Sequence, residues 1–124
     1  MKRDLELIRH ILTCIEESPN ADVEFKELKY GNYTGVSNLV LSHHIALLLN
    51  AGLIEAYSYG VVNCPTTFYS DIRMTMAGHD YLDAIRNDTI WNKTKSKLAD
   101  SLVSATFETI KKVAIRTLTS SLGL

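Results

Sequence analysis

Histidine and cysteine side chains are the first candidates for chemistry in this chain of 124 residues. His10 and Cys14 stand four residues apart, a spacing that zinc sites use, but two ligands do not complete a site. His43 and His44 are adjacent, so on a helix their side chains diverge by about 100° and do not readily bind one ion. The sequence therefore predicts no metal site and no cofactor.

Carboxylates beside a histidine are the second candidate. Asp80 and Asp83 follow His79 on one predicted helix, an arrangement that an acid–base set could use. The same spacing occurs on any exposed helical face, however, and the chain has no phosphate-binding glycine loop, no Gly-x-Ser-x-Gly elbow and no His-Glu-x-x-His. We predict that the protein is not an enzyme.

Polar side chains on a central helix are the third candidate. Asn38, Ser42 and His43 are predicted to share the outward side of a helix over residues 36–50, where they could hydrogen-bond to base edges in a major groove. Affinity for DNA comes mainly from Lys and Arg that neutralise phosphates, and none lies between Lys29 and Arg73. The alternative is that this face packs within the protein or binds a partner protein.

A lysine cluster, Lys93, Lys95 and Lys97, is the fourth candidate and could contact phosphates without reading bases. The alternative is a solvated helix face. Residues 1–88 contain seven Lys/Arg and twelve Asp/Glu, a net charge of −5, whereas residues 89–124 contain six and two, a net charge of +4. The chain is thus an acidic body with a basic tail, and any DNA binding should be weak and salt-sensitive.

Composition limits the class of protein. A chain of this length with 46% hydrophobic and 22% charged residues is typical of one soluble globular domain with a short appendage. No apolar run reaches the roughly 18–20 residues that span a bilayer, and the start of the chain lacks an apolar signal segment. We therefore predict no membrane contact, a cytoplasmic location, and reduced thiols at Cys14 and Cys64.

The first elements follow from spacing. Apolar residues at three- and four-residue intervals from Leu5 to Ile15 predict a helix, with Asp4 as its N-cap and Ser18-Pro19-Asn20 as its end. Alternation at residues 23–25 predicts a short edge strand, and residues 30–35 a loop. Within the helix over 36–50, we expect His44 to be buried and hydrogen-bonded to Tyr30, Tyr33 or a backbone group, and His43 to be exposed.

The following elements complete a recognisable order. Gly52 is placed to end the helix over 36–50, and residues 53–59 and 68–74 are predicted to be strands joined by a loop at 60–67. Thr75 should cap the next helix, with Tyr81, Leu82 and Ile85 inward. Helix, glycine stop, hairpin and capped helix are typical of a winged helix-turn-helix. We predict a mostly helical α+β fold with a winged helix-turn-helix domain over 1–88 and a C-terminal helical extension over 89–124.

The extension is expected to contain two helices. Trp91 should anchor the first to the core, and the second should run from about residue 105 to 122 with Lys112 and Arg116 on its polar side. Its apolar stripe must be buried, because an isolated helix of this length is marginal in water. The candidates for that burial are the chain's own core or a second copy, and we expect a homo-oligomer, with a dimer favoured. The stripe consists of Phe107, Ile110, Ala114, Leu118 and Leu122.

Three segments carry a family resemblance. They are Met1-Lys2-Arg3-Asp4-Leu5-x-Leu7-Ile8-Arg9, His44-Ile45-x-Leu47-Leu48-x-x-Ala51-Gly52-Leu53-Ile54, and Thr75-x-x-Gly78-His79-x-Tyr81-Leu82-Asp83-Ala84-Ile85-Arg86-Asn87-Asp88-Thr89-x-Trp91-Asn92-Lys93-Thr94-Lys95. Together they resemble a domain-of-unknown-function family of short proteins that phages, prophages and other mobile elements often encode. The resemblance covers nearly the whole chain and is weakest at residues 60–67. It implies a winged-helix fold and a mobile-element setting, and it brings no catalytic residues.

Two functions remain in view. The first is a regulatory winged-helix protein that acts as an oligomer and contacts nucleic acid. The second is an interaction module whose acidic winged face binds a host or phage protein and does not bind DNA directly. The frequency of DNA binding among winged helices favours the first, and the charge distribution favours the second.

Overall fold

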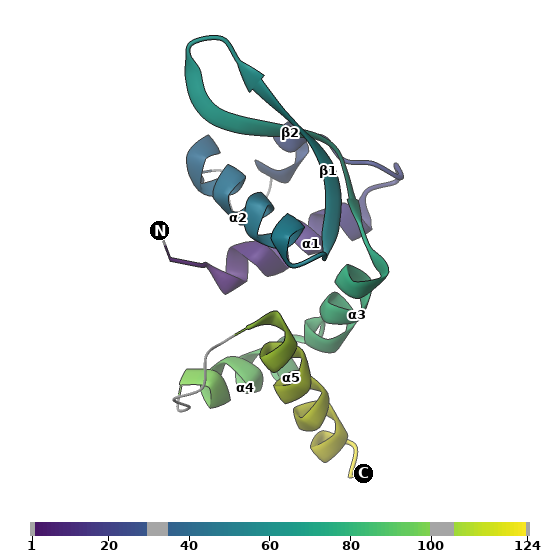
Figure 1. Ribbon diagram of the computed structural model, residues 1–124. Coiled ribbons are helices and arrows are strands. Elements are labelled where there is room, and N and C mark those ends of the chain that lie inside the picture. Colours follow the sequence, from purple (N-terminus) through teal and green to yellow (C-terminus); the bar gives the residue numbers. More distant parts are fainter. Residues whose placement is uncertain (1, 30–34, 100–105, 124) are drawn as a thin grey trace. The chain divides into compact units, whose positions relative to one another are not determined.

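The computed structural model describes residues 2–29, 35–99 and 106–123. Within these residues the chain forms five α-helices, one 3₁₀ helix and a two-stranded antiparallel hairpin, a mostly helical α+β architecture (Figure 1). Two compact units, Met1–His79 and Asp80–Leu124, divide the chain. The elements are α1 (Leu5–Glu17), η1 (Phe25–Lys29), α2 (Asn38–Asn50), β1 (Ile54–Val61), β2 (Cys64–Met74), α3 (Met76–Ile85), α4 (Asp88–Ala99) and α5 (Phe107–Ser121).

Helix α1 has the start and end that the sequence predicts. A carboxylate oxygen of Asp4 accepts hydrogen bonds from the backbone N–H groups of Glu6 and Leu7, at 3.0 and 3.1 Å. The helix stops at Glu17, because Ser18 is extended and Pro19 follows it. The side facing the core of the first unit contains Leu7, Ile8, Ile11, Leu12 and Ile15.

Helix α2 begins at Asn38, two residues later than predicted, because Ser37 is its N-cap and accepts from the N–H of Val40 at 3.2 Å. It ends at Asn50, with Ala51 as its C-cap, and Gly52 follows as the predicted stop, with a left-handed φ of +74°. The N–H groups of Gly52 and Leu53 then donate to the carbonyls of Leu49 and Leu48, which is a Schellman motif. The chain leaves this motif directly into β1.

The hairpin is longer than predicted, and the expected loop at 60–67 is wrong. Val61 pairs with Cys64, so the turn is only Val62 and Asn63, with Asn63 at φ +62°. Pro65 does not interrupt β2, because each strand of a two-stranded sheet has an open edge where a missing N–H is tolerated. The predicted antiparallel pairing of residues 53–59 with 68–74 is confirmed.

The opposite edge of β2 carries one further contact. The N–H of Val23 donates to the carbonyl of Ile72 at 2.8 Å, and the N–H of Ile72 donates back at 2.9 Å. Asp71, with φ of +51°, precedes this bridge where the register of β2 shifts against β1. The predicted strand at 23–25 is therefore a single bridge, and Phe25 begins the 3₁₀ helix η1.

The entry into α3 is tied to the start of the hairpin. The Thr75 hydroxyl donates to the carbonyl of Gly52 at 2.5 Å and accepts from the N–H of Gly78 at 3.1 Å. A Cβ on Gly78 would lie 2.1 Å from the Leu53 carbonyl oxygen, so only glycine fits this approach. Thr75 is thus a helix cap, as predicted, and also a bridge to the end of α2.

In the second unit, α4 and α5 pack against each other. Tyr81, Leu82 and Ile85 are buried, as predicted, and the Tyr81 and Phe107 rings meet edge to face at 5.2 Å. Trp91 is 1% exposed, so its side chain is buried, as an anchor of α4 would be. Thr106 caps α5, and residue 105, where this helix was expected to start, lies outside the described residues.

The described helices include none that is long and apolar enough to cross a membrane.

Candidate interaction site

The outward face of α2 contains fewer polar groups than predicted. Asn38 is exposed. His43 is half-buried, so its predicted exposure is only partly confirmed. Ser42 is only 7% exposed, and its hydroxyl donates to the Thr67 carbonyl of β2 at 2.7 Å. The predicted outward position of Ser42 is therefore wrong, because β2 covers it. Leu39, at 57% exposure, lies beside Asn38 on the surface instead.

His44 is fully buried, as predicted, and both partners are backbone groups. Its Nδ1 donates to the Val40 carbonyl and its Nε2 accepts from the Asp4 N–H, each at 2.8 Å. These bonds require the neutral ring with its proton on Nδ1. Asp4 therefore caps α1 with its side chain and holds α2 with its backbone, and His44 has a structural role.

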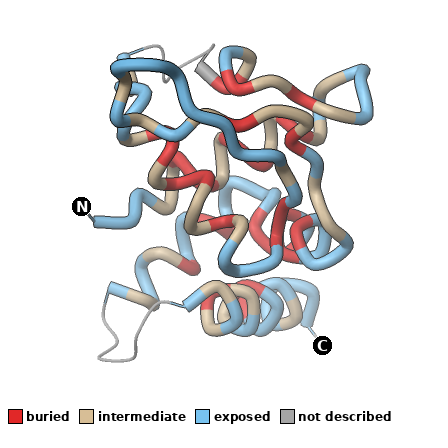
Figure 2. The backbone as a smooth tube through the Cα atoms, turned by 45° about the horizontal axis from the view of Figure 1, so that its top comes forward, coloured by how far each residue is buried: buried red, intermediate tan, exposed pale blue. Residues whose placement is uncertain are grey.

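The distal half of the hairpin is the most exposed apolar part of the first unit. Residues 57–63 are all exposed, as Figure 2 shows for the hairpin. The side chains of Tyr57, Tyr59, Val61 and Val62 are 69, 47, 50 and 88% exposed. We call these four residues the hairpin surface. The sequence contains no Lys or Arg between residues 30 and 72.

An aromatic hollow of about 430 Å³ adjoins the hairpin surface. Tyr59 stacks on Phe68 with ring centroids 5.8 Å apart, and Phe25 meets Phe68 edge to face at 5.2 Å. Asn38, Glu24 and Lys26 complete its lining. The hollow thus has an aromatic wall and a rim of mixed charge, a composition that suits an apolar side chain.

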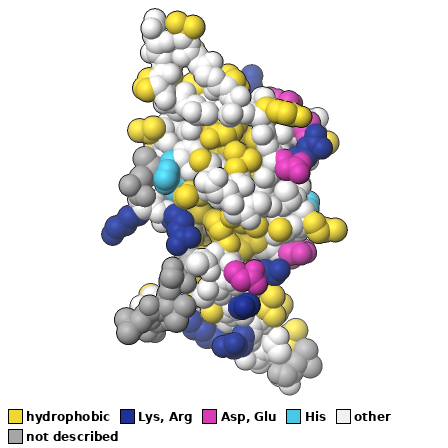
Figure 3. All heavy atoms as spheres, in the orientation of Figure 1, with side chains coloured by type: hydrophobic (Ala, Val, Ile, Leu, Met, Phe, Trp, Pro, Cys, Tyr) yellow, Lys and Arg dark blue, Asp and Glu magenta, His cyan; other side chains and the backbone are white. Residues whose placement is uncertain are grey.

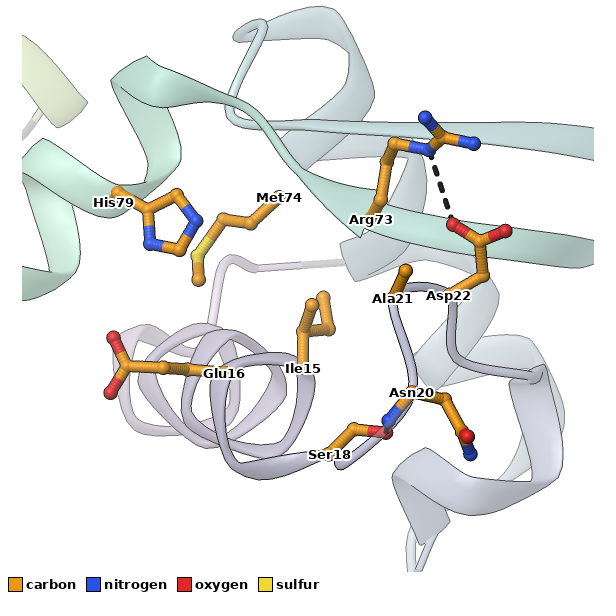
Figure 4. Close-up of a pocket in the computed structure, with 9 residues that line it drawn as sticks. All are labelled: Ile15, Glu16, Ser18, Asn20, Ala21, Asp22, Arg73, Met74 and His79. Atoms are coloured by element: carbon orange, nitrogen blue, oxygen red, sulfur yellow. Dashed lines mark hydrogen bonds and ion pairs between the residues drawn. The ribbon is translucent and has the colours of Figure 1, made fainter.

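A second hollow, of about 320 Å³, is more polar but does not converge on one point (Figure 4). Glu16 and His79 lie at one end, and Arg73 pairs with Asp22 at the other, with a nitrogen–oxygen distance of 3.2 Å. Ile15 and Met74 lie between the two ends. The described residues contain no group of three or more His, Cys, Asp and Glu side chains that could hold a metal ion.

His10 and Cys14 do approach each other, with Nε2 3.4 Å from Sγ. Burial raises the pKa of the Cys14 thiol, and the nearby Glu17 carboxylate raises it further. The thiol is therefore held protonated, whereas the thiolate is the form that binds metals and attacks electrophiles. This pair is best explained as helix packing.

The predicted lysine cluster on α4 separates into different environments. Lys93 is exposed, whereas the ammonium of Lys95 lies 5.4 Å from the centre of the Trp91 ring. Lys97 donates to the Thr117 hydroxyl on α5 at 2.9 Å. The pairing with α5 was missed, because only the packing of the two helices brings Lys97 to Thr117.

The predicted stripe of α5 is also divided. Ile110 and Ala114 are fully buried in the contact with α4, and Phe107 is half-buried against Tyr81. Leu118 and Leu122 remain 39 and 64% exposed, and Ile115, at 46%, continues their line along the helix. A second copy could reach only this outer line, and the predicted oligomer stays a prediction.

Comparison with known proteins assigns the chain to a family. Residues 2–104 match the family described as "Hypothetical protein (DUF2513)". A protein of Haemophilus influenzae (strain ATCC 51907 / DSM 11121 / KW20 / Rd), described as "Uncharacterized protein", is 37% identical over 114 residues, which cover 92% of each chain. No solved structure matches the chain significantly. The chain belongs to the DUF2513 family.

Proposed function

We propose that this protein is a winged-helix regulator of the mobile-element type that acts by binding another protein through its hairpin surface. The order of α1, η1, α2 and the hairpin supports a winged helix in which η1 replaces the usual second helix. The bridge between Val23 and Ile72 supports the same assignment, since it pairs the segment between α1 and η1 with β2. The mobile-element setting rests on the family resemblance of the sequence.

One observation carries the choice of a protein as the partner. The hairpin surface exposes two tyrosines and two valines, in a stretch of 43 residues, 30–72, that contains no Lys or Arg. A wing that follows a DNA backbone needs positive charge to neutralise phosphates. Aromatic residues, in contrast, are enriched in the contacts between proteins.

The aromatic hollow gives this contact a place for an anchoring residue. An apolar side chain from the partner would pack on Tyr59, Phe68 and Phe25, which are already in contact with one another. Rigid aromatic walls lose little side-chain entropy on binding. The partner is therefore expected to present an apolar residue beside a flat apolar surface.

A photo-crosslinking residue at Val62 tests the proposal. In cells that express the full chain, we expect the Val62 probe to form one dominant adduct with another protein, identified by mass spectrometry. The matched control is a probe at Met76, which is 78% exposed but lies outside the hairpin. Tyr57→Ser combined with Tyr59→Ser should remove the adduct while the circular dichroism spectrum is unchanged.

The competing outcomes are distinct. Equal adducts from Val62 and Met76 would contradict a specific hairpin contact, and an adduct of the chain with itself would make the hairpin a homodimer interface. Sequence-specific DNA binding that is lost with Asn38→Ala or His43→Ala would instead establish α2 as a recognition helix.

A further inference from the structure

The outer sides of α4 and α5 form a second surface, and its charge is opposite to that of the rest of the chain. Residues 89–124 contain six Lys/Arg and two Asp/Glu. Figure 3 shows Lys and Arg side chains over the part of the molecule built from these helices. Four of them, Lys93, Lys97, Lys112 and Arg116, are exposed, and none forms an ion pair with a carboxylate in the described parts of the chain.

Contacts between the helices organise this surface. Lys93 and Lys97 are one turn apart, so they share one side of α4. The Lys97 ammonium reaches Thr117, which brings the charge of α4 to α5. Lys112 and Arg116 are also one turn apart, so they share the exposed polar side of α5. Lys95, in contrast, lies on another side of α4, over Trp91.

The position of Lys97 is fixed without neutralising its charge. Thr117 is 2% exposed, and its hydroxyl donates to the Val113 carbonyl at 2.8 Å, so the hydroxyl presents a lone pair to Lys97. A neutral acceptor orients the ammonium and leaves its full positive charge for another group. An anion that binds here meets a cation that has already lost part of its side-chain freedom.

We propose that Lys93, Lys97, Lys112 and Arg116 form a binding surface for the phosphate backbone of a nucleic-acid duplex. Exposed Lys and Arg side chains without carboxylate partners neutralise phosphates through their charge, and they provide no contact that distinguishes bases. A lipid surface is less suitable, because Trp91, which could anchor the helices in a bilayer interface, is buried. This surface shares no residue with the hairpin surface, and the proposal does not rest on the function proposed above.

Fluorescence anisotropy with the full chain and a labelled 20-base-pair duplex tests the proposal. Four phosphate contacts should weaken binding by about 100-fold between 50 and 200 mM salt, from a dissociation constant in the micromolar range. An unlabelled duplex of unrelated sequence should compete equally. Lys93→Gln with Arg116→Gln should halve the slope of log affinity against log salt, and neither change touches Thr117.

The control variant changes the net charge by the same amount as the test variant. Lys2→Gln with Arg3→Gln removes two exposed positive charges from the first unit, and it should leave the slope unchanged. Equal losses from the two double variants would overturn the proposal, because net charge alone would then explain binding. So would no binding at 50 mM salt, or binding to phosphatidylserine vesicles that needs the same residues while the duplex does not bind.

Discussion

Thr75 and Gly78 show at the residue scale how two side chains fix a junction. The Thr75 hydroxyl joins the end of α2 to the start of α3, and the missing side chain of Gly78 lets Leu53 approach. The sequence motif Thr-x-x-Gly thus has a physical reason at both positions. The helix cap could be predicted from Thr75 itself, but the need for glycine could not, since Leu53 is 25 residues away.

Gly78→Ala should destabilise the fold. The new Cβ would meet the Leu53 carbonyl oxygen at 2.1 Å and Met74 Cγ at 2.5 Å. Overpacking of this kind costs about 1–3 kcal/mol, more than alanine gains over glycine in a helix. We expect thermal unfolding to show a midpoint lower by about 5–10 °C. Gly60→Ala is the control, because nothing lies within 4 Å of its Cβ position, and equal midpoints for the two variants would contradict the argument.

Cys14 should react slowly with thiol reagents. Burial raises the pKa of this thiol, and Glu17 adds to the rise, so little thiolate is present at neutral pH. In a Cys64→Ser background, iodoacetamide should alkylate the folded protein more slowly than the urea-unfolded protein, and the folded rate should increase as the pH is raised into the alkaline range.

Glu17→Gln separates the two causes of that raised pKa. Because burial is the larger cause, this change should restore only a small part of the lost reactivity. A folded protein that reacts as fast as the unfolded chain at pH 7 would show that Cys14 is accessible and ionised.

At the element scale, local signals predicted helices well and contacts between elements poorly. The cap at Asp4, the stop at Gly52 and the cap at Thr75 are each made within a few residues, so the sequence was sufficient. The hairpin was predicted too short, because cross-strand pairing extends through Gly60 and Pro65 despite their usual role in loops. Glycine and proline therefore predict the end of a strand in a two-stranded hairpin less reliably than they predict the end of a helix.

Candidate site residues were misplaced for the same reason. Ser42 was expected outward, but its hydroxyl bonds to Thr67, which is 25 residues away. Lys95 and Lys97 were grouped with Lys93, but Trp91 and Thr117 hold them differently. The hairpin surface was missed altogether, although tyrosines and valines without neighbouring lysines were a visible signal at residues 57–62.

At the scale of the whole molecule, the chain presents surfaces of different chemistry in its two compact units. The first unit exposes the apolar hairpin surface, and the second exposes four unpaired cations and the outer line of α5. The two proposals thus assign a protein partner and a nucleic acid to different residues of the chain.

The outer line of α5 is the place to test self-association. Leu118→Asp with Leu122→Asp adds charge to exposed residues, so it should convert a dimer to a monomer of 13.9 kDa in light scattering without changing the helical content. Ile110→Asp should instead unfold the second unit, because that side chain is fully buried. A monomer mass for the unmodified chain at high micromolar concentration would refute the dimer.

The free edge of β1 should affect the solubility and the half-life of the protein in the cell. Among the described residues, only β2 pairs with β1, so the N–H and C=O groups on the other edge of β1 have no strand partner. Glu55 is the only charged residue of β1. Natural proteins usually block such edges, because they recruit other strands and promote aggregation. We therefore expect copies made in excess of the partner to be short-lived or insoluble, so that the partner's abundance sets the steady-state level of this protein. Pulse-chase half-lives that do not lengthen when the crosslinked partner is co-expressed would argue against such a dependence.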